Sequence, residues 1–176
     1  MQPATDTIEE VILQTAATGA PVRLEHVRGH LKVEASPTSL HQITSRQIER
    51  SIGPIPGQEN GCACFGLADT LIRFPDADRS LKRPDIAIFC TQPPAIDEAL
   101  EVLPEAVIEI LSVGYEEKDL GPDGAQFYLE CGIADVLICD PRGKRVLYYQ
   151  AGEQGPVELN MSATVDLQCG CRVVLA

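Results

Sequence analysis

Residues 104–112 read PEAVIEILS, an apolar run with a single glutamate, Glu109, near its end. The run is short and is bounded by Pro104 and by Ser112-Val113-Gly114, a pattern typical of a strand that is buried on both faces. An ionised carboxylate in such a strand loses several kcal/mol of solvation unless something pairs with it. We therefore expect either a cation beside Glu109 or an open cleft that its side chain reaches.

A second apolar segment, DIAIFC at 85–90, begins with Asp85 directly after Pro84. If this segment pairs with the strand that carries Glu109, two carboxylates can converge at one end of a sheet. Carboxylate oxygens, completed by water, suit a Mg2+ ion, and such an ion can activate water for phosphodiester hydrolysis. The alternative is structural: Asp85 caps a turn, and Glu109 pairs with a nearby lysine or arginine.

Hydrophobic periodicity predicts an α/β (α+β) fold in a single domain over residues 1–176, with a mixed β-sheet core flanked by helices. An N-terminal helix is expected at 6–17, followed by a β-hairpin around Gly29. Further helices are expected at 38–52 and 124–131, and strands at 62–74, 85–90, 106–112, 134–140 and 144–152, before a strand-rich tail. The helix at 38–52 should face the core with its apolar stripe, Leu40, Ile43, Ile48 and Ile52.

Composition restricts the class of protein. The chain has 176 residues, of which 44% are apolar, as is ordinary for a globular protein. Its net charge of -12 weighs against broad nucleic-acid binding, although a bound metal ion can supply local positive charge. Because no apolar stretch approaches the roughly 20 residues of a membrane helix and the acidic N-terminus lacks a signal-peptide layout, we expect a cytoplasmic protein.

The seven cysteines are an odd number in a chain of this size, which fits a reducing compartment and argues against a disulfide scaffold. Two pairs, Cys62-x-Cys64 and Cys169-x-Cys171, could supply four thiolates to zinc. The usual zinc spacing leaves two or more residues between paired cysteines. The favoured interpretation is therefore that each pair packs on a strand as small buried hydrophobic side chains.

Short motifs follow one another in a fixed order along the chain. They are Arg23-Leu24-Glu25 with Gly29, Ser36-Pro37 with His41, Arg83-Pro84-Asp85, Ile108 to Ser112, Asp119 with Tyr128 and Gly132, and Asp135 to Pro141. In this order they resemble the Uma-two family, catalogued as a domain of unknown function within the PD-(D/E)XK restriction-endonuclease-like superfamily. The resemblance covers about residues 20–150, most of the chain.

This resemblance implies a restriction-endonuclease-like fold and a nuclease that cleaves DNA with Mg2+ or Mn2+. It implies that Asp85 and Glu109 bind the metal, that Glu25 is a third acid lining the site, and that His41 lies nearby on the helix after the hairpin. For Glu25, the alternative is an exposed hairpin residue. For His41, the alternative is a partly buried helix residue without a role at the site.

The chain departs from the family pattern at the lysine that orients the attacking water and stabilises developing negative charge. The parent motif has this lysine two residues after the glutamate, where this chain has Leu111. The family commonly has it on the following helix, where this chain has Asp123 and Gly124. Lys118 is the nearest substitute, but its acidic neighbours favour a solvated surface lysine. The departure implies either a stand-in lysine or a degenerate nuclease that keeps the fold.

A second hypothesis is a catalytically inactive protein-interaction module on the same fold. An acidic surface suits a basic partner, and the apolar tail CRVVLA at 171–176 predicts a strand edge that pairs with another copy. We therefore expect a homodimer or higher homo-oligomer, without membrane association. Zinc held by the cysteine pairs is a third hypothesis, which elemental analysis tests.

Overall fold

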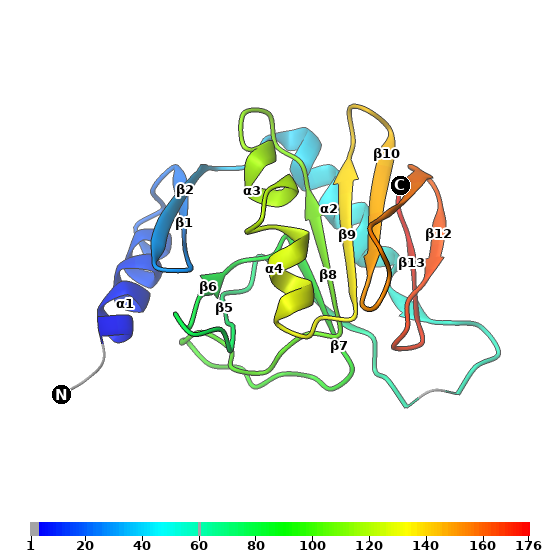
Figure 1. The fold of residues 1–176 in the computed structure, drawn as a ribbon, viewed down its shortest axis with the longest axis horizontal. Helices are drawn as coiled ribbons and strands as arrows, with labels where there is room; N and C mark the ends of the chain where they lie inside the picture. Colours follow the sequence, from blue (N-terminus) through cyan, green and yellow to red (C-terminus); the bar gives the residue numbers. More distant parts are fainter. Residues whose placement is uncertain (1–3, 60) are drawn as a thin grey trace.

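The computed structural model describes residues 4–59 and 61–176. Within them, a six-stranded sheet has the order β11-β10-β9-β8-β7-β4 and is flanked by helices (Figure 1). β8 and β9 run parallel, and the other neighbours in this sheet run antiparallel. The strands are β4 (Phe65–Ala68), β7 (Ile86–Phe89), β8 (Ala106–Ile110), β9 (Asp135–Asp140), β10 (Arg145–Gln150) and β11 (Val157–Asn160).

Two smaller sheets complete the architecture. One has the order β2-β1-β6-β5, formed by β1 (Val22–Val27), β2 (His30–Ala35), β5 (Ile72–Arg73) and β6 (Leu81–Lys82). The other has the order β12-β13-β3, formed by β3 (Gly53–Pro54), β12 (Thr164–Asp166) and β13 (Cys171–Val174). The predicted hairpin is confirmed: Arg28 and Gly29 both have positive φ, as a tight two-residue turn between β1 and β2 requires.

Helices occupy both faces of the large sheet. α3 (Glu116–Leu120) and α4 (Ala125–Glu130) form the crossover between β8 and β9, on the near side of the sheet in Figure 1. α2 (Ser39–Ser51) lies behind the sheet in the same view, and α1 (Ala4–Ala17) packs on β1. Among the described residues, no helix combines the length and the apolar character that crossing a membrane requires.

The central strands are buried on both faces, as the run around Glu109 predicts. Every residue of β7 and β8 is buried. Side chains alternate along a strand, so Ile86 and Ile88 pack with Ile48 of α2, whereas Ala87 and Phe89 belong to the core that contains α4. This double burial explains why the sequence of these strands is continuously apolar rather than alternating.

Two of the expected elements are wrong in detail. The strand expected at 62–74 is divided into β4 and β5, which belong to different sheets, because the chain turns at Asp69 with a φ of 51°. On α2, Leu40 and Ile43 are 41% and 57% exposed rather than buried. The helix instead buries the side that carries His41, Thr44 and Ile48, and this side faces the large sheet.

The tail does not provide the free strand edge that the sequence suggested. β13 is the middle strand of its sheet, with β12 on one side and β3 on the other. Beyond the β3 pairing, the Val174 amide donates to the Ser51 hydroxyl at 2.8 Å. Both sides of β13 are therefore paired within the chain, so the prediction of a free edge here is wrong, whereas self-association itself stays a prediction.

The cysteines also differ from expectation. Disulfides join Cys62 to Cys90 and Cys64 to Cys171, so the inference against disulfides is wrong for this structure. The free cysteines of the described chain are Cys131, Cys139 and Cys169. The strand spacing of each Cys-x-Cys pair gave no indication of these partners, since every bridge joins segments that are distant in sequence.

Candidate functional site

Asp85 and Glu109 lie opposite each other where the backbone pairing of β7 and β8 ends. The register Ile86↔Ile108 places them at the next pair of positions, and opposite residues of antiparallel strands share one face of the sheet. The Asp85 amide donates to Glu109 Oε2 at 3.0 Å, and the Ile110 amide donates to Asp85 Oδ2 at 2.8 Å. Each carboxylate thus completes the hydrogen bonding of the neighbouring strand end.

Glu109 is fully buried, and no arginine contacts it among the interactions of the described residues. Tyr128 of α4 donates its hydroxyl to Oε1 at 2.6 Å, and Lys118 Nζ lies 4.0 Å from Oε2. Burial raises the pKa of Glu109 well above its ordinary value; the charge of Lys118 acts against this rise, whereas the charges of Asp119 and Asp85 add to it. Burial therefore disfavours the ionised form of Glu109, and a cation bound beside it would favour that form.

Asp85 contacts Arg23 and His41. Arg23 Nη2 donates to Oδ1 at 3.2 Å, and His41 Nε2 lies 3.1 Å from Oδ2. Burial acts to raise the pKa of Asp85, but the contact with His41 and the charges of Lys118 and Arg23 outweigh it and lower the pKa. The structure therefore brings His41 directly to the predicted site, and Asp85 is an ionised carboxylate.

Glu25 of β1 is buried, so its interpretation as an exposed hairpin residue is wrong. The Arg83 amide donates to its Oε1 at 2.7 Å, whereas its buried Oε2 has no hydrogen-bond partner in the described part of the chain. Burial acts to raise the pKa of Glu25, yet Lys118, Lys82 and the Arg83 amide lower it overall. An ionised interior carboxylate with one unsatisfied oxygen is suited to binding a cation.

Lys118 is a largely buried member of this cluster, and the interpretation as a solvated surface lysine is wrong. Its side chain is 10% exposed, and Nζ lies 3.2 Å from Glu34 Oε2 and 3.5 Å from Asp119 Oδ1. Burial acts to lower the pKa of Lys118, but Glu109, Glu25 and the neighbouring acids hold it well above its ordinary value. The amine is therefore a fixed positive charge rather than a base.

Sequence reasoning did not assign Glu34 or Lys82 to the cluster, and it singled out Asp119 only as part of the family-like motif with Tyr128 and Gly132. Glu34 lies opposite Arg23 in the hairpin, so working out the hairpin register would have found it. Lys82 is fully buried in β6, where Nζ donates to the Asp123 carbonyl at 2.6 Å and lies 4.6 Å from the centre of the Tyr128 ring. A two-residue strand has no periodicity that could have indicated this burial.

The cluster carries an excess of negative charge. Among the described residues, the cluster contains five buried carboxyl groups and three cationic side chains. If all of them are ionised, two negative charges remain unbalanced. The acids are Glu25, Glu34, Asp85, Glu109 and Asp119, and the cations are Arg23, Lys82 and Lys118. Burial raises the pKa of Asp119 to about 7, and its Oδ1 lacks a hydrogen-bond partner within the described residues. A donor set of carboxylate oxygens with surplus negative charge fits a divalent cation of the Mg2+ type.

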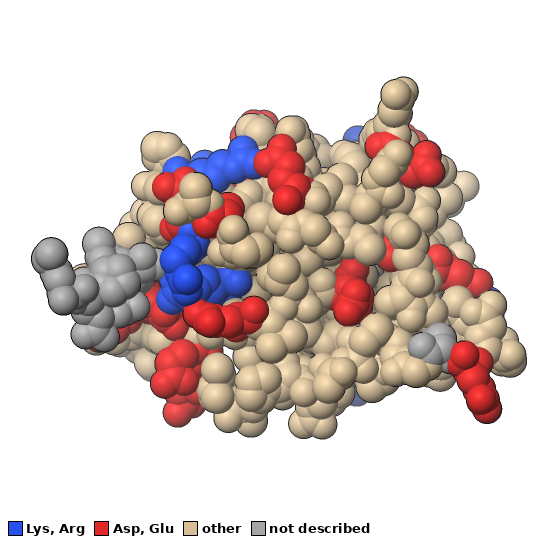
Figure 2. All heavy atoms as spheres, turned by 60° about the horizontal axis from the view of Figure 1, so that its bottom comes forward, with Lys and Arg blue, Asp and Glu red and all other residues tan. Residues whose placement is uncertain are grey.

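Two pockets open beside the cluster. One, of about 440 Å3, is lined by Asp85, Arg23 and His41 together with Arg46 and Arg50 of α2. The other, of about 310 Å3, is lined on its inner side by Glu25, Lys82 and Lys118. On the face shown in Figure 2, basic side chains gather towards the side of the N-terminal helix and are interspersed with acidic ones. Positive charge is therefore local in this acidic protein, and part of it lies at the pocket next to Asp85.

Comparisons with known proteins identify the fold and the family of the chain. One solved structure, described as a putative nuclease belonging to DUF820 from Anabaena variabilis, is similar with a TM-score of 0.61 and 16% identity, over 81% of this chain and 80% of that one. This likeness shows a shared fold. No curated protein matches the chain. The family model Uma2, described as "Putative restriction endonuclease", matches residues 8–169. The match covers nearly the whole chain, and the chain therefore belongs to the Uma2 restriction-endonuclease family.

Proposed function

We propose that the chain is a divalent-metal-dependent endonuclease that hydrolyses DNA phosphodiester bonds. The position of Lys118 is the observation that supports this most strongly. The strand that carries Glu109 has Leu111 where the parent motif has lysine, but α3 brings the Lys118 amine to 4.0 Å from Glu109. The cation that the motif lacks in sequence is thus available in space, which favours an active site over a degenerate one.

Asp85 and Glu109 would hold Mg2+ or Mn2+, because each carboxylate oxygen keeps lone pairs beyond the hydrogen bonds that it already accepts. The unsatisfied oxygen of Glu25 would contribute through water. When bound, the ion would supply an activated water molecule and stabilise charge on the phosphate. Each of these roles belongs to a named residue, so mutation of that residue tests it.

The protein's own cations have separate roles in this proposal. Lys118 remains charged, so it would orient the attacking water and stabilise negative charge developing on the phosphate. Arg46 and Arg50 line the pocket beside Asp85 and would contact neighbouring phosphates through charge-assisted hydrogen bonds. His41 would help to hold Asp85 in the orientation that ligation requires.

The test is cleavage of supercoiled and single-stranded DNA in Mg2+, Mn2+ or EDTA. We expect nicking that EDTA abolishes and that Asp85→Asn and Lys118→Met each reduce by at least about 100-fold, as loss of preorganised charge stabilisation does in other enzymes. Lys144→Met is the matched control, since Lys144 is exposed on the turn before β10. Cleavage that survives both site variants, or cleavage equally reduced by the control, would contradict the proposal.

The alternative is the inactive interaction module. It predicts no cleavage of any DNA and no metal-dependent change in stability. Self-association and a cytoplasmic location stay predictions, and light scattering of the purified chain tests the first of them. A stable oligomer whose DNA cleavage and metal response are both absent would favour the interaction module over the nuclease.

A further inference from the structure

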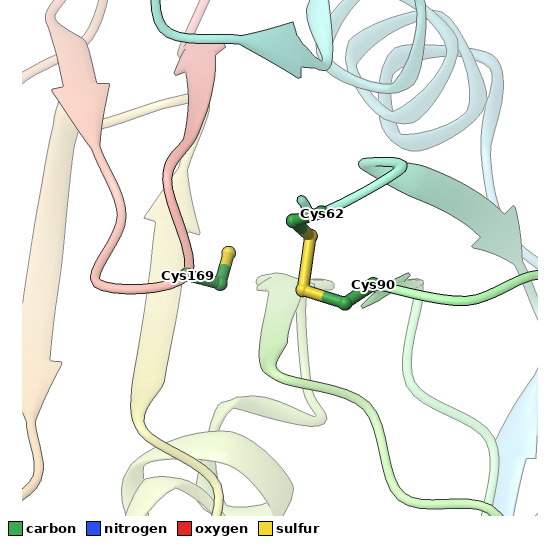
Figure 3. A group of neighbouring side chains, drawn as sticks. All are labelled: Cys62, Cys90 and Cys169. Atoms are coloured by element: carbon green, nitrogen blue, oxygen red, sulfur yellow. A yellow bond between two sulfur atoms is a disulfide. The ribbon is translucent and has the colours of Figure 1, made fainter. Parts of the chain in front are cut away.

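Five cysteine sulfurs from three distant segments gather at the end of β7 that is remote from Asp85. Cys62 and Cys64 precede β4, Cys90 directly follows β7, and Cys169 and Cys171 lie at the turn into β13. Figure 3 shows the Cys169 side chain directed towards the Cys62–Cys90 disulfide. This cluster is separate from the carboxylate site, because five residues of extended strand span about 17 Å.

The distances within the cluster are those of a shared ligand sphere. The sulfurs of Cys62, Cys90 and Cys169 lie within 4.8 Å of one another, as do those of Cys62, Cys64 and Cys171. Cys62 and Cys171 belong to different disulfides, yet their sulfurs are 3.4 Å apart. Zn–S bonds of about 2.3 Å in a tetrahedron separate neighbouring sulfurs by about 3.8 Å. No four sulfurs of the described residues lie within 4.8 Å of one another, so once the disulfides open, side-chain rotation must bring a fourth sulfur to one of the groups of three.

The Cys-x-Cys spacing is shorter than the usual zinc spacing of two or more intervening residues. In this structure the sulfurs of Cys62 and Cys64 nevertheless lie within 4.8 Å of each other. Here, three segments meet in the fold. Two of them carry two cysteines each, and the third, which directly follows β7, carries Cys90. The spacing within each pair therefore matters less than the meeting of the three segments.

We propose that this five-cysteine cluster, once its disulfides are reduced, binds one Zn2+ through four thiolates. Opening each disulfide takes two electrons and two protons from a cellular dithiol, which leaves as a disulfide. Zn2+ then displaces four thiol protons as four Zn–S bonds form. Oxidation by a disulfide of the same class reverses both steps and releases the ion. The bridged form and the zinc form are thus two redox states of one site.

Cys62 is the sulfur common to both groups of neighbouring cysteines. Without it, the remaining four sulfurs are one pair from each group and lack the member that the two groups share. Bound zinc would tie the segment before β4, the end of β7 and the start of β13 together. Its role would therefore be structural and redox-sensitive, without a part in phosphodiester hydrolysis.

The experiment uses the full chain, reduced with a phosphine that does not compete for zinc and then supplied with ZnCl2. Elemental analysis after gel filtration should give about one zinc per chain, and Co2+ in place of zinc should give the intense visible spectrum of a tetrahedral thiolate site. Cys62→Ser should lose most of the bound metal. Cys131→Ser and Cys139→Ser are matched controls that should retain it, since both cysteines lie outside the cluster.

A second measurement does not depend on whether the variants fold. In the wild-type chain, zinc should protect four of the five cluster cysteines from iodoacetamide, whereas Cys131 stays reactive when mass spectrometry locates the label. The proposal is overturned if the fully reduced chain binds no zinc, if Cys62→Ser binds as much as the wild type, or if zinc protects no cluster cysteine. Zinc that is lost on Asp85→Asn would place it at the carboxylates and would also overturn it.

Discussion

Replacing Glu109 with glutamine separates the two explanations for a buried acid in an apolar strand, a metal site and a structural ion pair. Burial favours the protonated form of Glu109, and glutamine is the neutral analogue of that form. Glutamine keeps an oxygen for the Asp85 amide and offers an N–H to the Tyr128 hydroxyl, so both hydrogen bonds can persist. We expect Glu109→Gln to unfold within about 1 kcal/mol of the wild type in EDTA.

The contrast with alanine gives the scale. Glu109→Ala leaves the Asp85 amide and the Tyr128 hydroxyl buried without partners, and each costs about 1–3 kcal/mol. Mg2+ at 100 times its Kd should stabilise the wild type by about 2.7 kcal/mol. It should stabilise neither Glu109 variant measurably, because one of the two ligands is gone.

The assay is urea unfolding at pH 7, with and without Mg2+, with Glu158→Gln as the control because Glu158 is exposed on β11. If Glu109→Gln destabilises the metal-free chain as much as Glu109→Ala does, Glu109 is an ionised partner of Lys118 and its charge is structural. If Mg2+ still stabilises the glutamine variant fully, Glu109 is not a ligand. Either result would refute the reasoning.

Three further predictions concern the same cluster. Lys118→Met should abolish DNA nicking while Mg2+ affinity, followed by urea unfolding, stays equal or rises, because the acids lose a competing cation; weaker Mg2+ binding would contradict this. Tyr128→Phe should cost about 1–3 kcal/mol in urea, since it leaves Glu109 Oε1 without its donor; unchanged stability would show that the bond contributes nothing. The folded pKa of about 7 for Asp119, against 3.8, means that the folded state binds more protons in this range. Metal-free stability should therefore fall as pH rises from about 4 to 7, at about 1.4 kcal/mol per unit of pKa difference, and Asp119→Asn should flatten a thermal-melting series in EDTA. The lowered pKa values of Glu25 and Asp85 act in the opposite direction, but only below about pH 4.5.

The strands of the core and the pair Asp85 and Glu109 could be predicted because their signal is local. A short apolar run with proline and glycine at its ends reports double burial directly. Once two such runs pair, the acids at their ends must meet. The register of the pair then follows from burial, since a shift of one residue would move every side chain to the other face.

The cations and the sulfurs could not be predicted in the same way, because long-range packing positions them. Lys118 lies in a five-residue helix among acids, a segment whose composition is that of a solvated loop. Its burial depends on Glu34 from the hairpin and Glu109 from β8, which are distant in sequence. Likewise, Cys62 meets Cys90 and Cys171 only after three segments have folded together.

The reciprocal hydrogen bonds between the strand ends at Asp85 and Glu109 indicate which substitutions the fold would tolerate at position 109 in the absence of selection for cleavage. The backbone amide of Asp85 needs a hydrogen-bond acceptor from the side chain at position 109, but it does not need a charge there. Glutamine would therefore accept this hydrogen bond as well as glutamate does. Without selection for catalysis, replacement of Glu109 by glutamine should therefore be tolerated. The negative charge at position 109 is therefore a requirement of the proposed metal site and not of the fold.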